Sequence, residues 1–180
     1  MNPTCPSCDA SLPTQATKCD HCGYSYNLLN AYYRYNREYS LEVTRICDET
    51  ETLSPRVLKK LTKLSDHFSD IFPGLFFSVY FESREEEPDT KGLWLLNNLV
   101  YQDLTDETHR QFGFLLYIDP EAERAALSMG LGLSQYIEID ELELIFATCD
   151  GFLAKKQYVK AVKELLSQLS VNLIKKCPSS

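Results

Sequence analysis

The feature that most constrains the fold is the stretch of residues 112–133, which reads FGFLLYIDPEAERAALSMGLGL. It contains two apolar runs joined by a polar turn around Pro120, and Gly130-Leu131-Gly132 closes the second run. Short apolar runs bounded by turn residues are typical of strands buried in the middle of a sheet. This stretch therefore predicts the central pair of strands of a globular domain, joined as a hairpin.

Helix and strand signals precede the hairpin. Ser54 is suited to cap a helix that begins at Pro55, and Pro73-Gly74 is suited to end it. Between them, apolar residues recur at helical spacing, namely Leu58, Leu61, Leu64, Phe68 and Ile71. The next run, Leu75 to Phe81, is short and rich in strand-forming residues, which predicts a strand buried on both faces. An acidic loop from Glu82 to Asp89 follows it, and we expect this loop to be solvated.

Further elements complete the domain. The stretch from Leu41 to Ile46 alternates apolar with polar residues, which predicts a short strand. The stretch from Lys91 to Tyr101 predicts a helix. Apolar spacing predicts two more helices, one between Leu142 and Cys149 and one between Tyr158 and Leu173, with a break at Gly151. The chain is thus predicted to be α/β, with a layered α/β sheet domain over residues 42–176 that is large enough to bury its own core.

Four cysteines near the amino terminus have the spacing of zinc ligands. Cys5 and Cys8 form one C-x2-C pair, Cys19 and Cys22 form a second, and ten residues separate the two pairs. Each pair places two thiolates on one turn, and two such turns complete the tetrahedron that zinc prefers. Because four cysteines leave no open position for water, the predicted zinc is structural. Residues 1–26 are therefore predicted to form a small zinc ribbon in front of the domain.

This segment resembles the short zinc ribbons that precede many bacterial domains, whose pattern is close to Cys-Pro-x-Cys, Leu-Pro and Cys-x-x-Cys-Gly. Leu12-Pro13 and Gly23 match that pattern. The alternative is a redox CxxC pair, which the close spacing of two pairs and the lack of a surrounding βαβ pattern disfavour. His21 is a further candidate ligand, but with four thiolates available we expect it to be exposed.

Residues 27–41 are predicted to form an aromatic connector between the ribbon and the domain. Six of the 11 tyrosines lie in or beside it, namely Tyr24, Tyr26, Tyr32, Tyr33, Tyr35 and Tyr39. Tyrosines interleaved with Arg34 and Arg37 could stack on single-stranded bases. The alternative is that they pack against the ribbon and the domain. The zero net charge of residues 1–46 favours packing, because nucleic-acid sites need excess positive charge.

The formal net charge of −8 belongs to residues 47–180. This charge makes nucleic-acid binding unfavourable and suits a cationic partner or a bound divalent ion. No apolar run reaches the roughly 18 residues of a membrane-spanning helix, and no signal peptide is recognisable. We therefore expect a cytoplasmic protein without membrane insertion, and the odd number of cysteines, 7, also fits a reducing compartment.

Residues 42 to about 173 resemble a TPM domain, the fold of thylakoid-lumen acid phosphatase-like proteins of photosystem repair and of many bacterial membrane-associated proteins. The resembling residues begin with Asp48, Leu53-Ser54 and the strand Phe77-Ser78-Val79. The central strand of the family, its Pro-Glu turn and its Gly-x-Gly-Leu segment have counterparts here in the same register, followed by two matches in the last helix. These are Gly113, Leu115, Leu116, Ile118, Pro120, Glu121, Gly130, Gly132, Leu133, Tyr158 and Ala161. The resemblance implies a layered α/β fold and a phosphatase-like site for a metal ion and phosphate.

Two positions depart from the family pattern. Gln111-Phe112 stands where the family usually has Asn or Asp before the glycine that opens the strand. Ser134 stands where it usually has Glu after Gly-x-Gly-Leu. Hydrolysis of a phosphate ester with a hard cation needs carboxylate oxygens to hold that cation. The departures therefore imply that the acidic site is degenerate.

Three acids are the remaining candidates for catalysis, namely Glu82, Asp103 and Asp119. They could gather at one end of the sheet and bind Ca or Mg, and the alternative is that they are ordinary surface residues. His67 is expected on the exposed side of its helix, without a nucleophile at recognisable spacing. Cys149 lies among apolar helix residues, which indicates a core position rather than a reactive thiol.

The favoured hypothesis is a cytoplasmic zinc-binding interaction or regulatory protein that has a protein partner and is built on a TPM-like domain with a degenerate acidic site, which favours a role other than catalysis. The alternative is a divalent-metal-dependent phosphatase-like hydrolase, in which an ion held by Asp119 and neighbouring acids activates water. Nucleic-acid binding through the ribbon and the tyrosines is a third hypothesis.

Overall fold

The computed structural model describes residues 10, 19–22, 42–83, 87–102, 104 and 109–176. The chain divides into two units, Met1–Ser40 and Leu41–Ser180. The fold described below is that of the second unit. The tyrosines of the predicted connector and the cysteines Cys5 and Cys8 lie outside the described residues.

A four-stranded mixed sheet forms the middle of the second unit. Its strands run in the order β2, β3, β5 and β6. Their bounds are Ile46–Asp48 for β2, Phe76–Phe81 for β3, Gly113–Asp119 for β5 and Arg124–Met129 for β6. The first three strands are parallel, and β6 pairs antiparallel to β5 as the predicted hairpin. A separate parallel pair joins β1 (Glu42–Val43) to β4 (Val100–Tyr101). The predicted α/β class and layered sheet are confirmed.

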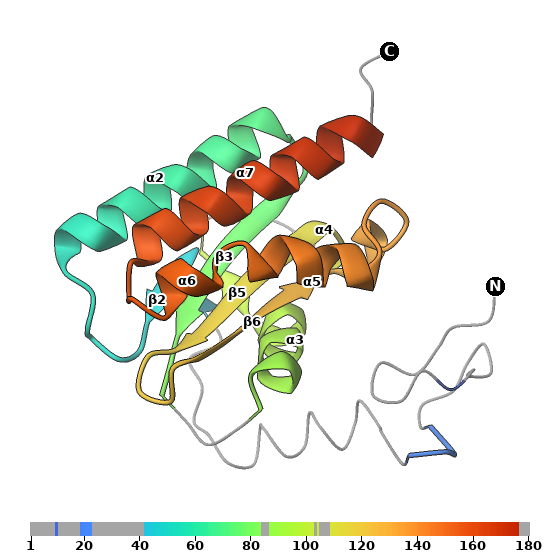
Figure 1. Cartoon of the computed structure of the whole chain (residues 1–180), viewed down its shortest axis with the longest axis horizontal. Helices are drawn as coiled ribbons and strands as arrows, with labels where there is room; N and C mark the ends of the chain where they lie inside the picture. Colours follow the sequence, from blue (N-terminus) through green and yellow to red (C-terminus); the bar gives the residue numbers. More distant parts are fainter. Residues whose placement is uncertain are drawn as a thin grey trace. The chain divides into compact units, whose positions relative to one another are not determined.

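Helices cover both faces of the sheet (Figure 1). Their bounds are Pro55–Ile71 for α2, Pro88–Asn98 for α3, His109–Phe112 for α4, Ile139–Ala147 for α5, Asp150–Leu153 for α6 and Tyr158–Lys176 for α7, with a 3-10 turn at Leu131–Leu133. Helix α2 starts as predicted, because the Ser54 hydroxyl accepts a bond from the Val57 amide at 3.4 Å and Pro55 takes the first position. Helices α2 and α7 run side by side in the same direction (Figure 1).

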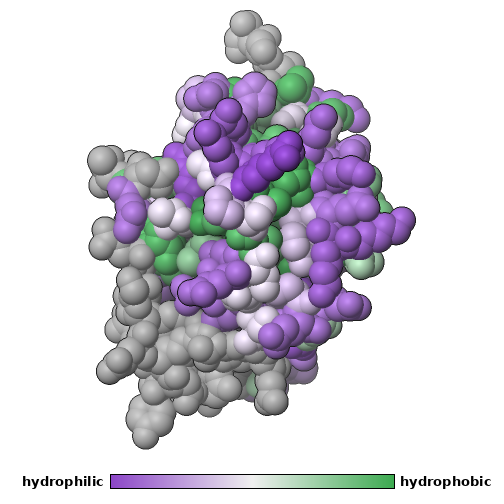
Figure 2. Space-filling view, turned by 90° about the vertical axis from the view of Figure 1, so that its left-hand side faces the viewer, coloured by the Kyte–Doolittle hydropathy of each residue, from purple (hydrophilic) through white to green (hydrophobic). Residues whose placement is uncertain are grey.

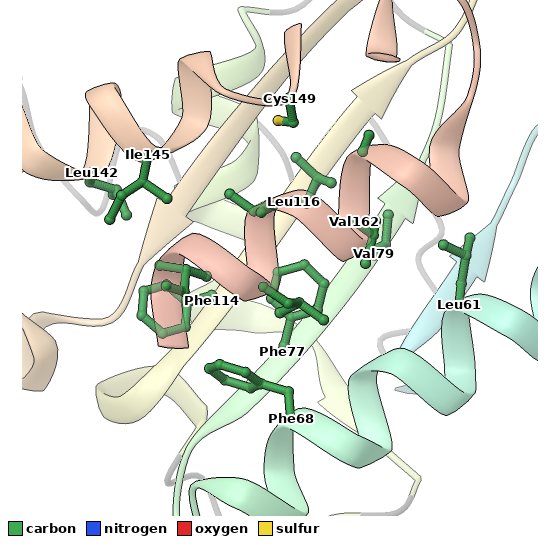
Figure 3. Packing of buried hydrophobic residues seen from close by; sticks show 14 of the residues in the cluster. Leu61, Phe68, Phe77, Val79, Phe114, Leu116, Leu142, Ile145, Cys149 and Val162 are labelled. Carbon is green, nitrogen blue, oxygen red and sulfur yellow. The ribbon is translucent and has the colours of Figure 1, made fainter. Parts of the chain in front are cut away.

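The main core lies between the sheet and the layer of α2, α5 and α7. Phe68 of α2 lies with its ring centre 6.2 Å from those of Phe77 on β3 and Phe114 on β5 (Figure 3). Val162 of α7 and Leu61 of α2 are fully buried in the same cluster. Aromatic pairs at these distances add roughly 0.5 to 1.5 kcal/mol beyond the area that they bury. They join α2 to the two central strands.

Helix α3 covers the opposite face. Trp94, Leu95 and Leu96 of α3 are each at most 1% exposed, and Tyr117 of β5 is fully buried on this side of the sheet. Because helices lie on both faces, every residue of β3 and β5 is buried. This explains why both strands have nearly unbroken apolar sequences instead of alternating ones.

The glycine motif after β6 has a packing role. The Gly130 amide bonds the Gly113 carbonyl at 2.9 Å, so the chain leaves the hairpin beside the start of β5. At Gly132, a Cβ atom would lie 2.9 Å from the Gln111 carbonyl oxygen and 2.8 Å from the Phe112 ring. The 3-10 turn therefore approaches α4 closely enough that a side chain at Gly132 does not fit.

Three element boundaries differ from the predictions. The strand expected over residues 41–46 is two short strands, because the chain leaves β4 after Val43 and resumes pairing with β3 at Ile46. The helix expected to begin at Lys91 begins at Pro88, and it ends before Val100–Tyr101 because that segment pairs with β1. Gly151 lies within α6, and the break falls at residues 154–157, where the Gln157 amide bonds the Phe152 carbonyl at 2.8 Å.

Replacing Gly132 with alanine should lower the free energy of unfolding by about 1 to 3 kcal/mol, because the methyl group meets a backbone carbonyl that cannot rotate away. Urea denaturation followed by circular dichroism measures the change. Gly151→Ala is the matched control, because nothing lies within 4 Å of its Cβ position in α6. We expect no loss for the control, and equal losses for the two variants would contradict the packing role of Gly132.

Candidate functional site

The carboxyl ends of the three parallel strands meet at one edge of the sheet, and an acid stands at each end. The strand register aligns Asp48 of β2 with Phe81 of β3, and Phe81 with Ile118 of β5. Glu82 and Asp119 each follow by one residue, and the Glu82 amide bonds the Ile118 carbonyl at 3.0 Å. Ligands of open α/β sheets commonly bind at this edge. Two of the predicted candidates, Glu82 and Asp119, therefore lie on neighbouring strand ends, whereas Asp103 lies outside the described residues.

Asp119 holds the hairpin turn. One of its carboxylate oxygens, Oδ1, accepts bonds from the Glu121 amide at 3.1 Å and the Ala122 amide at 3.0 Å. The other, Oδ2, lies 3.6 Å from Nη2 of Arg124, and the Asp119 side chain is only 2% exposed. Asp119 thus organises the turn between β5 and β6.

Glu82 is buried, contrary to the expectation that its loop is solvated. Its Oε2 atom lies 3.4 Å from Nζ of Lys91, and the Lys91 side chain is fully buried. The Lys91 ammonium also lies 5.4 Å from the centre of the Trp94 ring. The pair is buried because Glu82 leaves β3 on the face that α3 covers, so its charge needs a partner within the protein.

Asp48 holds the loop that leads into α2. Its Oδ2 atom accepts a bond from the Leu53 amide at 2.8 Å, and Oδ1 accepts one from the Thr50 amide at 3.1 Å. Asp48 also acts on the neighbouring Tyr158, because burial first, then the negative charges of Asp48 and Glu123, raise the pKa of the Tyr158 hydroxyl. Carboxylates from two loops of this edge therefore act on the start of α7.

The acids of the strand ends are thus engaged in structural contacts. Within the described part of the chain, no three or more His, Cys, Asp or Glu side chains are grouped so that they could hold a metal ion. A divalent ion at Glu82 would compete with the Lys91 ammonium, and one at Asp119 would compete with Arg124 and two turn amides. The described geometry gives no support to a Ca or Mg site made from Glu82 and Asp119.

Two cavities lie on either side of the hairpin turn at the same edge. The larger, of about 650 Å³, lies between the starts of α2 and α7, and the smaller, of about 460 Å³, lies between the turn and α6. Pro120, Lys156 and Tyr158 line both cavities. Figure 2 looks onto this end of the sheet, where hydrophobic groups lie in the middle of the face between hydrophilic ones.

Strained backbone is concentrated beside these cavities. Among the described residues other than glycine, positive φ angles occur at Glu51, Glu123 and Lys156, with values of 53°, 54° and 52°. Each lies in a loop at the carboxyl edge, and Lys156 donates a bond from Nζ to the Pro120 carbonyl at 3.0 Å. This bond joins the turn before α7 to the hairpin turn, so it fixes the wall between the two cavities.

A third cavity, of about 730 Å³, lies at the amino-terminal end of β3. Apolar groups such as Phe72, Leu75 and Phe112 line it. Ile71 and Ile174 at its rim are 48% and 58% exposed. No charged side chain lines this cavity within the described part of the chain, so its chemistry does not define a ligand.

The described half of the predicted zinc site is compatible with metal binding. Cys19 is buried and Cys22 is exposed, and residues 20–22 form a turn. Two thiols three residues apart on one turn are the donor arrangement of a zinc knuckle. His21 is exposed, as expected. Cys5 and Cys8 lie outside the described residues, so the complete ligand set stays a prediction.

Two other residues lie as predicted. Cys149 is fully buried, and its thiol donates to the Phe146 carbonyl at 2.9 Å. Burial, together with the charge of Asp150, raises the pKa of this thiol to about 12, so it is unreactive at neutral pH. His67 is exposed on α2.

Sequence reasoning missed Lys91 and Lys156. Lys91 stands four residues before Leu95, so helical spacing places it on the buried face of α3, and this signal could have identified it. The contact from Lys156 to Pro120 joins residues 36 apart and has no local signal.

None of the helices in the described residues is long and apolar enough to cross a lipid bilayer.

Comparisons with known proteins give information on each unit. A model of the uncharacterised protein family UPF0547 matches residues 4–28, which contain all four amino-terminal cysteines. None of the curated proteins matches the chain.

Two structures solved in solution by NMR are similar in fold. One is the N-terminal domain of a protein from P. gingivalis, with a TM-score of 0.55 and 15% identity over 73% of this chain and 82% of that one. The other is the N-terminal domain of the cg2496 protein from Corynebacterium glutamicum, with a TM-score of 0.56 and 13% identity over 80% of this chain and 88% of that one. At these identities the likeness shows the fold.

Removing one partner of the Glu82–Lys91 pair should be strongly destabilising. Glu82→Leu or Lys91→Met should each lower the free energy of unfolding by roughly 3 to 5 kcal/mol, because the other charge is left buried. The double variant should recover most of that loss, as measured by urea denaturation in a double-mutant cycle.

Asp66 provides the control, because its side chain is 54% exposed and lies 3.9 Å from the half-buried Arg45. Asp66→Ala should change stability by less than about 1 kcal/mol. If the losses at Glu82 and Lys91 simply add in the double variant, the structural role assigned to the pair is wrong.

Proposed function

We propose that this protein is a cytoplasmic zinc-binding interaction or regulatory protein, in which a zinc ribbon over residues 1–26 is tethered to a TPM-like domain over residues 42–176. The observation that carries the proposal is the contrast between two sets of side chains. The amino-terminal segment has a full set of four zinc-type cysteines, whereas the acids at the strand ends are already engaged in turn and ion-pair contacts. A chain that has a structural zinc site, and whose strand-end acids are not available to hold a divalent ion, suits binding better than hydrolysis.

Zinc would be held by Cys5, Cys8, Cys19 and Cys22, and when bound it would supply folding energy to the ribbon. Such sites contribute about 10 to 16 kcal/mol in zinc-finger peptides. The family match over residues 4–28 supports treating this segment as a module of its own.

The TPM-like assignment of the domain is supported by the roles of the residues that carry the resemblance. Gly132 has a close approach that excludes a side chain, Asp48 holds the loop before α2, and Asp119 precedes the Pro-Glu turn that it organises. The fold likeness to two N-terminal domains is consistent with it.

Removing zinc should unfold the ribbon and leave the domain intact. The purified chain should contain about one zinc ion, and a strong chelator should collapse the amide signals of residues 1–26 in a proton–nitrogen NMR spectrum. The signals of residues 42–176 should stay unchanged. A metal-free chain whose amino-terminal signals are dispersed would contradict the proposal.

The interaction role is tested by partner capture with the full chain. Proteins retained from lysate by the wild-type chain should be lost, at least in part, with the Cys5→Ser/Cys8→Ser variant, because the ribbon cannot fold without its metal. Identical sets of retained proteins would count against a role mediated by the ribbon.

The hydrolase hypothesis makes a separate prediction. We expect no release of phosphate from p-nitrophenyl phosphate in the presence of Mg or Ca, because Glu82 and Asp119 are engaged elsewhere. Asp119→Ala should instead lower stability by about 1 to 3 kcal/mol, since two turn amides lose their acceptor. Metal-dependent turnover that disappears in Asp119→Ala would reverse the assignment.

A further inference from the structure

The two cavities at the carboxyl edge adjoin each other and share Pro120, Lys156 and Tyr158 as lining residues. We refer to the two together as the groove, and its two halves differ in chemistry. The half between α2 and α7 has an apolar lining that includes Leu53, Val57 and Val159. The half beside α6 has a mixed lining in which Glu123 and Asp150 are exposed acids. We call these the apolar half and the acidic half. Tyr158 stands between them, with its ring edge-on to Phe81 at 5.0 Å.

The acidic half has charge available for a ligand. Of the basic side chains around the groove, Arg124 is paired with Asp119, whereas Lys156 donates to the neutral Pro120 carbonyl and keeps its charge at the shared wall. Lys160 lies in the lining of the apolar half. Glu123 and Asp150 are exposed and form no ion pair with another described residue. Burial and then the charges of Asp48 and Glu123 raise the pKa of Tyr158, which agrees with the placement of Glu123 close to the centre of the groove.

Two adjoining cavities suit alternate side chains of an extended chain. Successive side chains on one side of an extended segment are about 6.6 to 6.8 Å apart, since each residue rises about 3.3 Å. Two adjoining cavities that share one wall can therefore take residues i and i+2 of the same segment. The excess of acidic residues in 47–180, which carry the whole net charge of −8, would attract a basic segment.

We propose that this groove binds an extended segment of a partner protein that carries an apolar residue two positions from an arginine or lysine. The apolar side chain enters the half lined by Leu53, Val57 and Val159, and the cation lies between Glu123 and Asp150. The inference rests on the proposed interaction function and assigns the surface and the chemistry of the partner.

Three short peptides test the proposal against the full chain by NMR titration. They are acetyl-Gly-Leu-Gly-Arg-Gly-amide, the same peptide with Glu in place of Arg, and the same peptide with Gly in place of Leu. The first should shift the amide signals of residues in both halves, including Asp150, Tyr158 and Val159. We expect the Glu peptide and the Gly peptide each to bind about fivefold more weakly, because each loses one of the two contacts.

Charge reversal at the acidic half provides the decisive variant. Glu123→Lys/Asp150→Lys should reverse the order, so that the Glu peptide binds more tightly than the Arg peptide. Asp70→Lys/Asp140→Lys changes the net charge equally at two exposed positions that do not line the groove, and it should leave the order unchanged. Glu123→Lys by itself keeps α6 intact and should reduce the preference for Arg by roughly twofold.

Several outcomes would overturn the proposal. These are equal binding of the Arg and Glu peptides, shifts confined to other surfaces, no shifts at all, or an unchanged order in the charge-reversed double variant. Equal binding of the Leu and Gly peptides would make the groove a pocket for small cations and would also overturn it. These results do not depend on the ribbon or on cell extract, so failure here is distinguishable from failure of the interaction function, which is tested through Cys5 and Cys8.

Discussion

Burial of β3 and β5 on both faces is the constraint on which the rest of the domain depends. Two apolar strands of this kind are stable only if a layer of helices covers each side of the sheet. Helices α2, α5 and α7 supply one layer, and α3 supplies the other, where Trp94, Leu95 and Tyr117 are buried. The close approach at Gly132 follows from the same demand, because the chain returns from β6 against the start of β5.

The same burial explains the chemistry of the carboxyl edge. Glu82 follows a fully buried strand, so its charge lies under α3 and is offset by Lys91. Asp119 ends the neighbouring strand, accepts bonds from two turn amides and pairs with Arg124. The edge where α/β sheets commonly bind ligands therefore carries two cavities, while two of its acids stabilise the fold. The charge left for recognition lies on the loops around it, at Glu123 and Asp150.

We propose that the two units draw their stability from different sources. A segment of about 26 residues is too small to bury a sufficient core, and zinc coordination would provide its folding energy. Residues 41–180 have a core of their own, which includes Phe77, Phe114 and Leu165. Loss of the metal is therefore expected to affect one unit without the other, and this independence suits a protein in which a ribbon and a domain each contact a partner.

Several residues of the candidate site could be identified from the sequence, but the structural roles of those residues could not. Glu82 and Asp119 were recognised as acids at strand ends, since strand positions follow from apolar runs. Lys91 neutralises Glu82 because of the way α3 is rotated about its axis. Asp119 accepts bonds from the turn amides because of the backbone conformation of residues 119–122. Asp103, Cys5 and Cys8 lie outside the described residues, so their assignments stay predictions.

Sequence by itself determined the elements whose signals are local and repeated: the long helices α2 and α7, the buried strands and the hairpin. It misplaced the two-residue strands β1 and β4, which exist only because each pairs with the other across the chain. Tertiary structure also decided that Lys91 is buried and that two adjoining cavities share Tyr158 as a lining residue. The physical reason is that periodicity arises from the geometry of one segment, whereas pairing, charge neutralisation and cavities arise from contacts between residues far apart in the chain.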